Sequence, residues 1–413
     1  MKRKDHLLNI LALCILVFMS SKTESKAADN NRIYAGTAKV DYTPSFVPDS
    51  LINDHQFIRV IAFSDGQNKA LLIAHETQYT GNKLWDEMTK RIQSETGIAP
   101  EYIVMSAIHT HSGVKPGDDF NDKMMSCVKE ALVNLKPAKI GVGKGECLMN
   151  MSRRAPAASG GYWIGKNPYA PCDHEVTVLR IDDENGKPLS IMVNWPAHAV
   201  INWPKPKLFS GDWPGATAKF VEAAYQNKIT VPVSIGASGD INPLYWAPYE
   251  GDKLGTEDVG ERAIKIDGNA ITAKILGEEA IRVANEVVTF PSGHISAKQR
   301  LLTLPGKKRF STRMPDQKIE QGDDLQVRLT ALKVGNIVFA GFGGEVMTEI
   351  GMHLKEQSPY KNTFVITHCN GSSGYLVTDE ALKEGGYESG GSSSMPGCEK
   401  SMIDNLLEMI SEL

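Results

Sequence analysis

The sequence lacks a long lysine/arginine run, a CxxC pair and any apolar segment long enough to cross a membrane as a helix. Its 45 Lys and Arg against 49 Asp and Glu give a formal net charge of −4. Proteins that follow nucleic-acid phosphates usually carry a basic face, so no nucleic-acid partner is expected. Without CxxC a cysteine zinc site is unsupported, and six cysteines in 413 residues make no small disulfide framework.

The longest apolar segment, residues 7–19, follows three basic residues at positions 2–4. It is shorter than the ~20 residues that a transmembrane helix needs. Ser25-Lys26-Ala27 places small residues where signal peptidase cuts. We therefore expect residues 1–27 to be a secretory signal peptide and the mature chain to be exported, either periplasmic or secreted.

Strand-like and helix-like patterns alternate along the rest of the chain. Hairpins are predicted for 58–64 with 69–74, 176–181 with 190–195, and 325–334 with 337–342. Further strands are predicted at 102–108 and 363–367, and helices at 83–96, 122–135, 215–226, 268–288 and 399–413. This order predicts an α/β (mixed α+β) domain over 28–413, in which helices cover mixed sheets. The Gly/Ser-rich stretch 385–394 is predicted to be a loop inside that domain.

Two histidines and a carboxylate lie just past predicted strands. His109-Thr110-His111 follows strand 102–108, and His198 follows strand 190–195. Glu345 follows strand 337–342 through glycines that would place it at a helix start. Taken singly, each has an ordinary interpretation as a hydrogen-bonded or helix-terminal side chain. Together they describe a catalytic His/His/Glu metal site with an open coordination position.

The order of these motifs resembles that of the neutral/alkaline (non-lysosomal) ceramidase family, in its N-terminal catalytic domain. The matching segments are HTHSG at 109–113, NWPAH at 194–198, SGDWPG at 210–215, SGDINP at 238–243, GGE at 343–345, GYLVT at 374–378 and the Tyr387-Glu388 pair. The resemblance covers essentially all of residues 28–413. It implies a fold like that domain, without the family's C-terminal immunoglobulin-like domain.

The resemblance also implies one catalytic zinc ion. Its ligands would be His109, His198, Glu345 and the phenol of Tyr375. His111 would lie over the bound water or the substrate oxygen. Arg154 and Tyr387 would lie near the scissile group, although Ser152-Arg153-Arg154-Ala155-Pro156 also aligns in a register that places Arg153 there.

Asn242 departs from the family pattern. Ceramidases typically read Gly-Asp-Val-Ser-Pro-Asn, in which the serine has been proposed as a nucleophile, whereas positions 239–244 here read Gly-Asp-Ile-Asn-Pro-Leu. Asparagine cannot act as that nucleophile, but it can donate a hydrogen bond to an oxyanion. A route through water activated by zinc is therefore expected, and the identity of the substrate is left open.

The leading hypothesis is an exported zinc-dependent amidohydrolase that cleaves the N-acyl bond of a small-molecule amide or lipid, as an N-acylsphingosine amidohydrolase does. Such a substrate is compatible with peripheral contact with membrane lipid, and no protein partner is inferred. One alternative keeps the metal scaffold but assigns an ester, lactone or non-sphingolipid amide. Others are a non-catalytic lipid- or glycan-binding protein, and a non-haem iron oxygenase, which also uses two histidines and a carboxylate.

Overall fold

An eight-stranded mixed sheet is the largest element of the structure, a computed structural model that describes residues 32–113, 117–157, 160–202, 208–246, 267–291, 293–310 and 318–413. The expected signal peptide at 1–27 lies outside the described residues. The strand order is β10-β9-β8-β5-β1-β2-β3-β4. The strands are β1 (Tyr34–Asp41), β2 (Phe57–Ser64), β3 (Lys69–His75), β4 (Ile103–Ala107), β5 (Lys136–Glu146), β8 (Glu175–Asp183), β9 (Pro188–Trp195) and β10 (Val233–Ile235). The hairpins predicted at β2–β3 and β8–β9 are confirmed as antiparallel pairs, whereas β3–β4 and β9–β10 are parallel.

A four-stranded sheet packs face to face on the large one. Its order is β12 (Ile295–Leu304), β13 (Leu325–Val334), β14 (Ile337–Phe342) and β16 (Asn362–Ile366). The predicted β13–β14 hairpin is confirmed, and β14 pairs with β16 in parallel. Leu72 and Val104 of the large sheet share one buried cluster with Phe339 and Phe364 of the smaller sheet. The molecule therefore has a two-sheet core.

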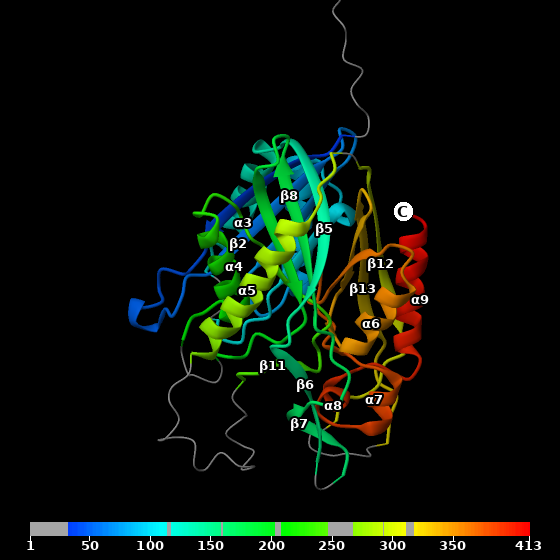
Figure 1. Cartoon of the computed structure of the whole chain (residues 1–413). Coiled ribbons are helices and arrows are strands. Elements are labelled where there is room, and N and C mark those ends of the chain that lie inside the picture. Colours follow the sequence, from blue (N-terminus) through cyan, green and yellow to red (C-terminus); the bar gives the residue numbers. More distant parts are fainter. Residues whose placement is uncertain are drawn as a thin grey trace, which may run out of the picture. The chain divides into compact units, whose positions relative to one another are not determined.

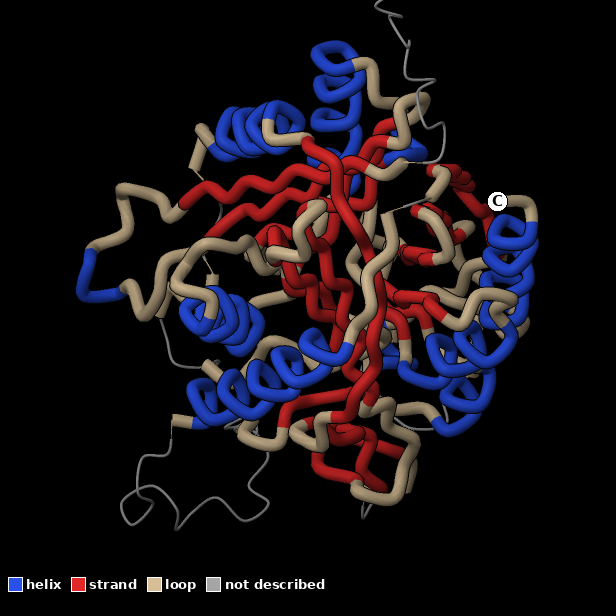
Figure 2. The backbone as a smooth tube through the Cα atoms, turned by 45° about the horizontal axis from the view of Figure 1, so that its top comes forward, coloured by secondary structure: helices blue, strands red, loops and turns tan. Residues whose placement is uncertain are grey.

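Helices cover the outer faces of both sheets, as Figures 1 and 2 show. The large sheet carries α2 (Asn82–Thr96), α3 (Phe120–Val133), α4 (Asp212–Ala224) and α5 (Gly268–Glu286), and the smaller one carries α6 (Thr348–Gln357) and α9 (Cys398–Ser411). Strand β2 shows how the layers form, because Ile58 and Val60 face the helices while Ile61 and Phe63 face the second sheet. The predicted mixed α+β class is confirmed, with the layers arranged helix–sheet–sheet–helix.

Several short elements lie beyond one end of the two large sheets (Figure 1). They are the sheet β11 (Ile241–Pro243), β6 (Asn150–Pro156) and β7 (Tyr162–Asn167), the pair β15 (Glu345–Val346) and β17 (Tyr375–Leu376), and helices α7 (Asp379–Glu384) and α8 (Tyr387–Gly391). Two predictions are corrected here. Helix α8 lies inside the stretch predicted to be a loop, and Glu345 belongs to a strand, since α6 begins only at Thr348.

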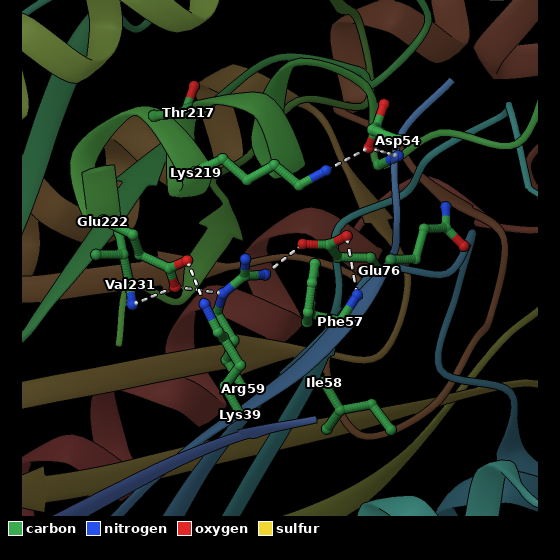
Figure 3. A network of polar contacts seen from close by, with 12 residues as sticks. Lys39, Asp54, Phe57, Ile58, Arg59, Glu76, Thr217, Lys219, Glu222 and Val231 are labelled. Atoms are coloured by element: carbon green, nitrogen blue, oxygen red, sulfur yellow. Dashed lines mark hydrogen bonds and ion pairs between the residues drawn. The ribbon is translucent and has the colours of Figure 1, made fainter. Parts of the chain in front are cut away.

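A buried ion-pair network fastens α4 to the large sheet (Figure 3). On β2, the Arg59 guanidinium donates to Glu222 of α4 at 2.9 Å and pairs with Glu76, which directly follows β3. Lys39 of β1 also reaches Glu222, at 2.7 Å. Removing one partner of such a buried network leaves a charge without compensation, which costs ~3–5 kcal/mol. The network therefore anchors the last turn of α4, which carries Glu222, to the large sheet.

The described chain contains no helix long and apolar enough to cross a membrane. Within the same residues, all the cysteines are free thiols: Cys127, Cys147, Cys172, Cys369 and Cys398.

Candidate metal centre

The chain leaves the strand pleat directly after β4, at His109. This residue adopts a left-handed backbone conformation, with φ of 60°. The Nε2 atoms of His109 and His111 lie 3.2 Å apart. The Nδ1 of His109 lies 2.7 Å from the carbonyl oxygen of Gln78. Because a carbonyl can only accept, this contact puts the proton on Nδ1 and leaves the Nε2 lone pair facing the cluster.

His198 is oriented in the same way just past β9. Its Nδ1 lies 2.7 Å from the Ser238 carbonyl oxygen and 3.1 Å from that of Ile241. Its Nε2 is buried and finds no hydrogen-bond partner among the described residues. The following segment is held by the buried Asp212 carboxylate, which accepts from the Asn202 N–H at 2.8 Å. The 210–215 motif thus holds the loop that carries His198.

Glu345 and Tyr375 are brought together by the parallel pair β15–β17, in which they are register partners. A Cβ on Gly344 would lie 2.8 Å from the Gly374 carbonyl oxygen, so this close approach requires glycine. The Glu345 Oε2 atom lies 3.7 Å from Nε2 of His109 and 3.5 Å from Nε2 of His198. The four residues proposed as ligands therefore meet where strands of both sheets end.

These atoms suit a metal ion. Four ligands at about 2.1 Å from a tetrahedral ion are separated by about 3.4 Å, which is close to the 3.7 Å and 3.5 Å between Glu345 Oε2 and the Nε2 atoms of His109 and His198. Glu345 Oε2 is buried without a hydrogen-bond partner in the described part of the chain, as is His198 Nε2. Burial lowers the pKa of His109 and, more strongly, that of His198, so both imidazoles are neutral and able to bind an ion at neutral pH. Burial alone would raise the pKa of Glu345, but His109 and other nearby groups outweigh it and lower that pKa.

His368, which none of the sequence motifs indicated, also belongs to the cluster. Its ring stacks on that of His109, with centroids 3.8 Å apart and planes 16° apart. His109, Glu345 and His368 form one group of candidate ligands, and His109, His111 and His198 form another. The signal was present, because His368 follows β16 just as His109 follows β4.

Arg153 lies beside the cluster, whereas Arg154 is directed to a different set of partners. Arg153 donates to the Tyr375 hydroxyl at 3.0 Å and to Glu388 at 2.7 Å. Arg154 pairs with Glu388 at 3.1 Å and with Glu384 at 2.9 Å. The ladder between β6 and β7 shifts register between Ser152 and Arg154, so both arginines can reach Glu388. The register that places Arg153 beside Tyr375 is therefore the one that the structure adopts.

Asn242 and Tyr387 surround Arg153 instead of contacting the histidines. The Asn242 Oδ1 atom accepts from Arg153 at 3.4 Å, within the short strand β11. The Tyr387 ring lies edge-on to that of Tyr375 at 5.8 Å and faces the Arg153 guanidinium at 5.5 Å. Asn242, Arg153 and Tyr387 thus form a layer next to the candidate ligands.

A cavity of about 670 Å³ lies next to the cluster and includes His111 in its wall. Its lining surface is mainly apolar and also includes amide, hydroxyl and charged groups: Gln56, Thr77, Gln78, Tyr79, Gly81, Lys83, Leu84, Glu87, Thr110, His111, Gly113, Gly117, Asp118, Phe120 and Asn121. This volume is typical of small-molecule sites.

No family model matches the sequence. Two solved structures share its fold. One is a ceramidase complexed with C2, with a TM-score of 0.74 and 13% identity over 92% of this chain and 75% of that one. The other is the neutral ceramidase from Pseudomonas aeruginosa, with a TM-score of 0.73 and 14% identity over 92% of this chain and 74% of that one. At these identities the likeness establishes the fold, and it confirms the structural resemblance predicted from the motifs.

Proposed function

We propose that this chain is a zinc-dependent hydrolase that cleaves the N-acyl bond of a small-molecule amide or lipid. One observation carries the proposal. His198 Nε2 and Glu345 Oε2 are buried, and neither has a hydrogen-bond partner in the described chain. Glu345 Oε2 lies 3.5 Å from His198 Nε2 and 3.7 Å from His109 Nε2, where the strands end. A protein that only binds lipid would gain nothing from burying these unpaired atoms close together. The shared ceramidase fold supports the choice of an amide bond.

His109, His198, Glu345 and Tyr375 would hold the ion. Two imidazoles, a carboxylate and a phenol are donors that suit zinc. Zinc bound there supplies Lewis acidity, which makes a water molecule more acidic and polarises an acyl carbonyl. The carbonyl oxygens of Gln78 and Ser238 fix the proton of each imidazole on Nδ1, so that Nε2 remains a donor to the ion.

The neighbouring side chains can carry the rest of the reaction. His111 lies 3.2 Å from His109 and lines the cavity, where it can pass a proton from water to the leaving nitrogen. The guanidinium of Arg153 is a fixed positive charge beside Tyr375 and can stabilise an oxyanion, a role that we assign to Arg153 in place of Arg154. Tyr387 offers a second donor there, and Asn242 helps to orient the guanidinium.

A substrate screen with and without a chelator tests this proposal. The purified full chain would be offered an N-acylsphingosine, N-acyl amino acids, simple esters and lactones. We expect hydrolysis of an amide that a chelator abolishes and added zinc restores. The double variant His109→Ala/His198→Ala should lose both zinc and activity, whereas His353→Ala, on the exposed side of α6, should keep both.

Two results would overturn the proposal. In one, the double variant keeps full zinc content and full activity. In the other, no amide or ester is hydrolysed in a chelator-sensitive way.

Asn242 supports a second candidate substrate class on the same scaffold. The cavity wall is mainly apolar but also carries Lys83, Glu87, Asp118 and Asn121, so it offers partners to a substrate with hydrogen-bonding substituents as well as to an alkyl chain. Asn242 stands where ceramidases typically have serine. A non-sphingolipid amide, an ester or a lactone is therefore the second candidate, and the relative kcat/KM values from the same screen decide between the two classes.

We also propose that the chain is exported through residues 1–27. The basic, apolar and small-residue order of that segment supports this. N-terminal sequencing of the protein recovered outside the cytoplasm of an expressing cell should find a chain that begins at residue 28. Full-length protein retained in the cytoplasm would contradict export.

A further inference from the structure

We infer that Thr110, between His109 and His111 in the chain, is a positioning residue that sets where His111 lies in the cavity wall. The inference rests on the proposed function, because it concerns the proton transfer assigned there to His111. It begins with the Thr110 hydroxyl, which donates to the Ser210 carbonyl at 2.8 Å. Thr110 is only 1% exposed, and a hydroxyl buried to this extent needs its partners.

The residues on both sides of His111 bond to Ser210. Thr110, which precedes His111, reaches the Ser210 carbonyl with its hydroxyl. The carbonyl of Ser112, which follows His111, accepts from the Ser210 N–H at 2.7 Å. The Thr110 hydroxyl also accepts from the Ser112 N–H at 3.2 Å, and the His111 N–H donates to the Ala199 carbonyl at 3.1 Å. The backbone around His111 is therefore held by two segments that are distant in the sequence.

Ser210 is itself fixed by its surroundings. It is fully buried, and its hydroxyl donates to the Asp54 carboxylate. The same hydroxyl accepts from the Asn202 side chain and from the Asp212 N–H, both at 2.9 Å. These contacts use the one donor and the two acceptor positions that a serine hydroxyl has. Because Asn202 belongs to the segment that follows His198, Ser210 joins that segment to the one that carries Thr110.

The two histidines beside Thr110 depend on it to different degrees. The His109 ring has its own contact, from Nδ1 to the Gln78 carbonyl oxygen at 2.7 Å. The proton transfer proposed for His111 depends on where the backbone places its ring, and a displacement of about 1 Å in a catalytic group costs roughly 10²-fold in rate. We therefore expect the Thr110 hydroxyl to affect kcat through His111 and to leave zinc binding through His109 unchanged.

Three substitutions of Thr110 separate positioning from packing. Thr110→Val replaces the hydroxyl by a methyl group, Thr110→Ala removes the hydroxyl without a replacement, and Thr110→Ser keeps it. Thr89→Val is the matched control, since Thr89 is also buried and its hydroxyl donates to the Trp85 carbonyl at 2.8 Å within α2. The unfolding midpoints show which variants are folded.

The readouts are kcat and KM for the substrate that the screen identifies, and zinc affinity by competition with a coloured chelator. We expect Thr110→Val and Thr110→Ala to lower kcat roughly 10- to 100-fold, with a smaller change in KM. Thr110→Ser should recover most of the lost kcat. All variants should bind zinc as wild type does. Thr89→Val should lower the unfolding midpoint but keep the wild-type kcat, as expected for a hydroxyl that serves only the fold.

A folded Thr110→Val protein with wild-type kcat would overturn the inference and leave the proposed hydrolase standing. A parallel loss of zinc affinity and kcat would also overturn it, because the hydroxyl would then act on the ion site as a whole. If the Val variant does not fold, the Ala variant decides by the same criteria, and if neither folds the hydroxyl serves the fold and the inference fails. If wild type hydrolyses nothing in the screen, the proposed function fails, and the inference fails with it.

Discussion

Two histidines of the cluster, His109 and His368, have left-handed backbones, with φ of 60° and 51°. His109 and His111 are two residues apart, so a regular strand would place both on the same face. In the structure their Nε2 atoms lie 3.2 Å apart although His109 has left the strand conformation. A sequence pattern can indicate that a strand ends near residue 108, but the φ angle of the next residue depends on contacts made by distant segments.

The different contacts of Arg153 and Arg154 predict different effects of their substitution on kcat. Arg153→Gln should lower kcat by about 10²- to 10³-fold, because it removes a donor beside the reacting group. Arg154→Gln should change kcat far less, since Arg154 pairs with Glu384 and Glu388. Steady-state kinetics of both variants, alongside their unfolding midpoints, check this. Equal losses of kcat in two equally stable variants would contradict the assignment.

His75 predicts a pH effect on stability. This histidine of β3 is fully buried between Thr77 and Thr80, and burial lowers its pKa to about 3. Its pKa in the unfolded chain is about 6.5, so between these values the unfolded state binds more protons and stability falls as pH falls. The contribution is intact above pH 6.5 and decreases by about 2 kcal/mol between pH 7.5 and 5.

Urea unfolding of wild type and His75→Gln at those two pH values measures this effect. The glutamine variant cannot titrate, so it should lose about 2 kcal/mol less stability than wild type between them. The comparison cancels the contribution of every other histidine. Parallel pH profiles for the two proteins would show that His75 is not the group responsible.

At the scale of elements, the shortest strands do the most to build the site. The two-residue strands β15 and β17 place Glu345 opposite Tyr375, and the three-residue strand β11 carries Asn242. Periodicity needs more residues than these to show a pattern. Long hairpins such as β13–β14 were therefore predicted from sequence, whereas the strand that holds Glu345 was expected to be a helix start.

Gly239 tests how tightly these elements fit. Its N–H donates to the Val346 carbonyl, and a Cβ placed there would lie 2.9 Å from the Glu345 carbonyl oxygen. Gly239→Ala should therefore push β15 and displace Glu345, weakening zinc binding and lowering the free energy of unfolding by ~1–3 kcal/mol. Gly81→Ala is the control, because its backbone is extended and its nearest neighbours lie at 4.0 Å.

Metal titration and urea unfolding of the two glycine variants measure these effects. Zinc affinity in Gly239→Ala equal to that in Gly81→Ala would show that β15 tolerates the added methyl group without moving its carboxylate.

In the whole molecule, the candidate metal centre connects strand ends from both sheets. Binding of an ion there should therefore raise the free energy of unfolding of the entire chain. An ion that binds only the folded chain stabilises it by about 2.7 kcal/mol when its free concentration is 100 times its dissociation constant. Removing zinc with a chelator should therefore lower the unfolding midpoint, and added zinc should restore it. Scanning calorimetry measures both steps.

The double variant His109→Ala/His198→Ala provides the control for this prediction. Its midpoint should not respond to zinc. A wild-type midpoint that is equally indifferent to zinc would contradict an ion site within the folded core.

The amino-acid order was enough to predict the alternation of strands and helices, because each long element buries a face with its own period. It was also enough to mark His109, His198 and Glu345, because each follows a recognisable strand. The choice of Arg153 over Arg154, the presence of His368 and the pairing of Glu345 with Tyr375 came from the folded chain. These features arise from contacts between segments far apart in sequence, through a β-bulge, a left-handed residue and a two-residue strand, none of which has a local period to detect.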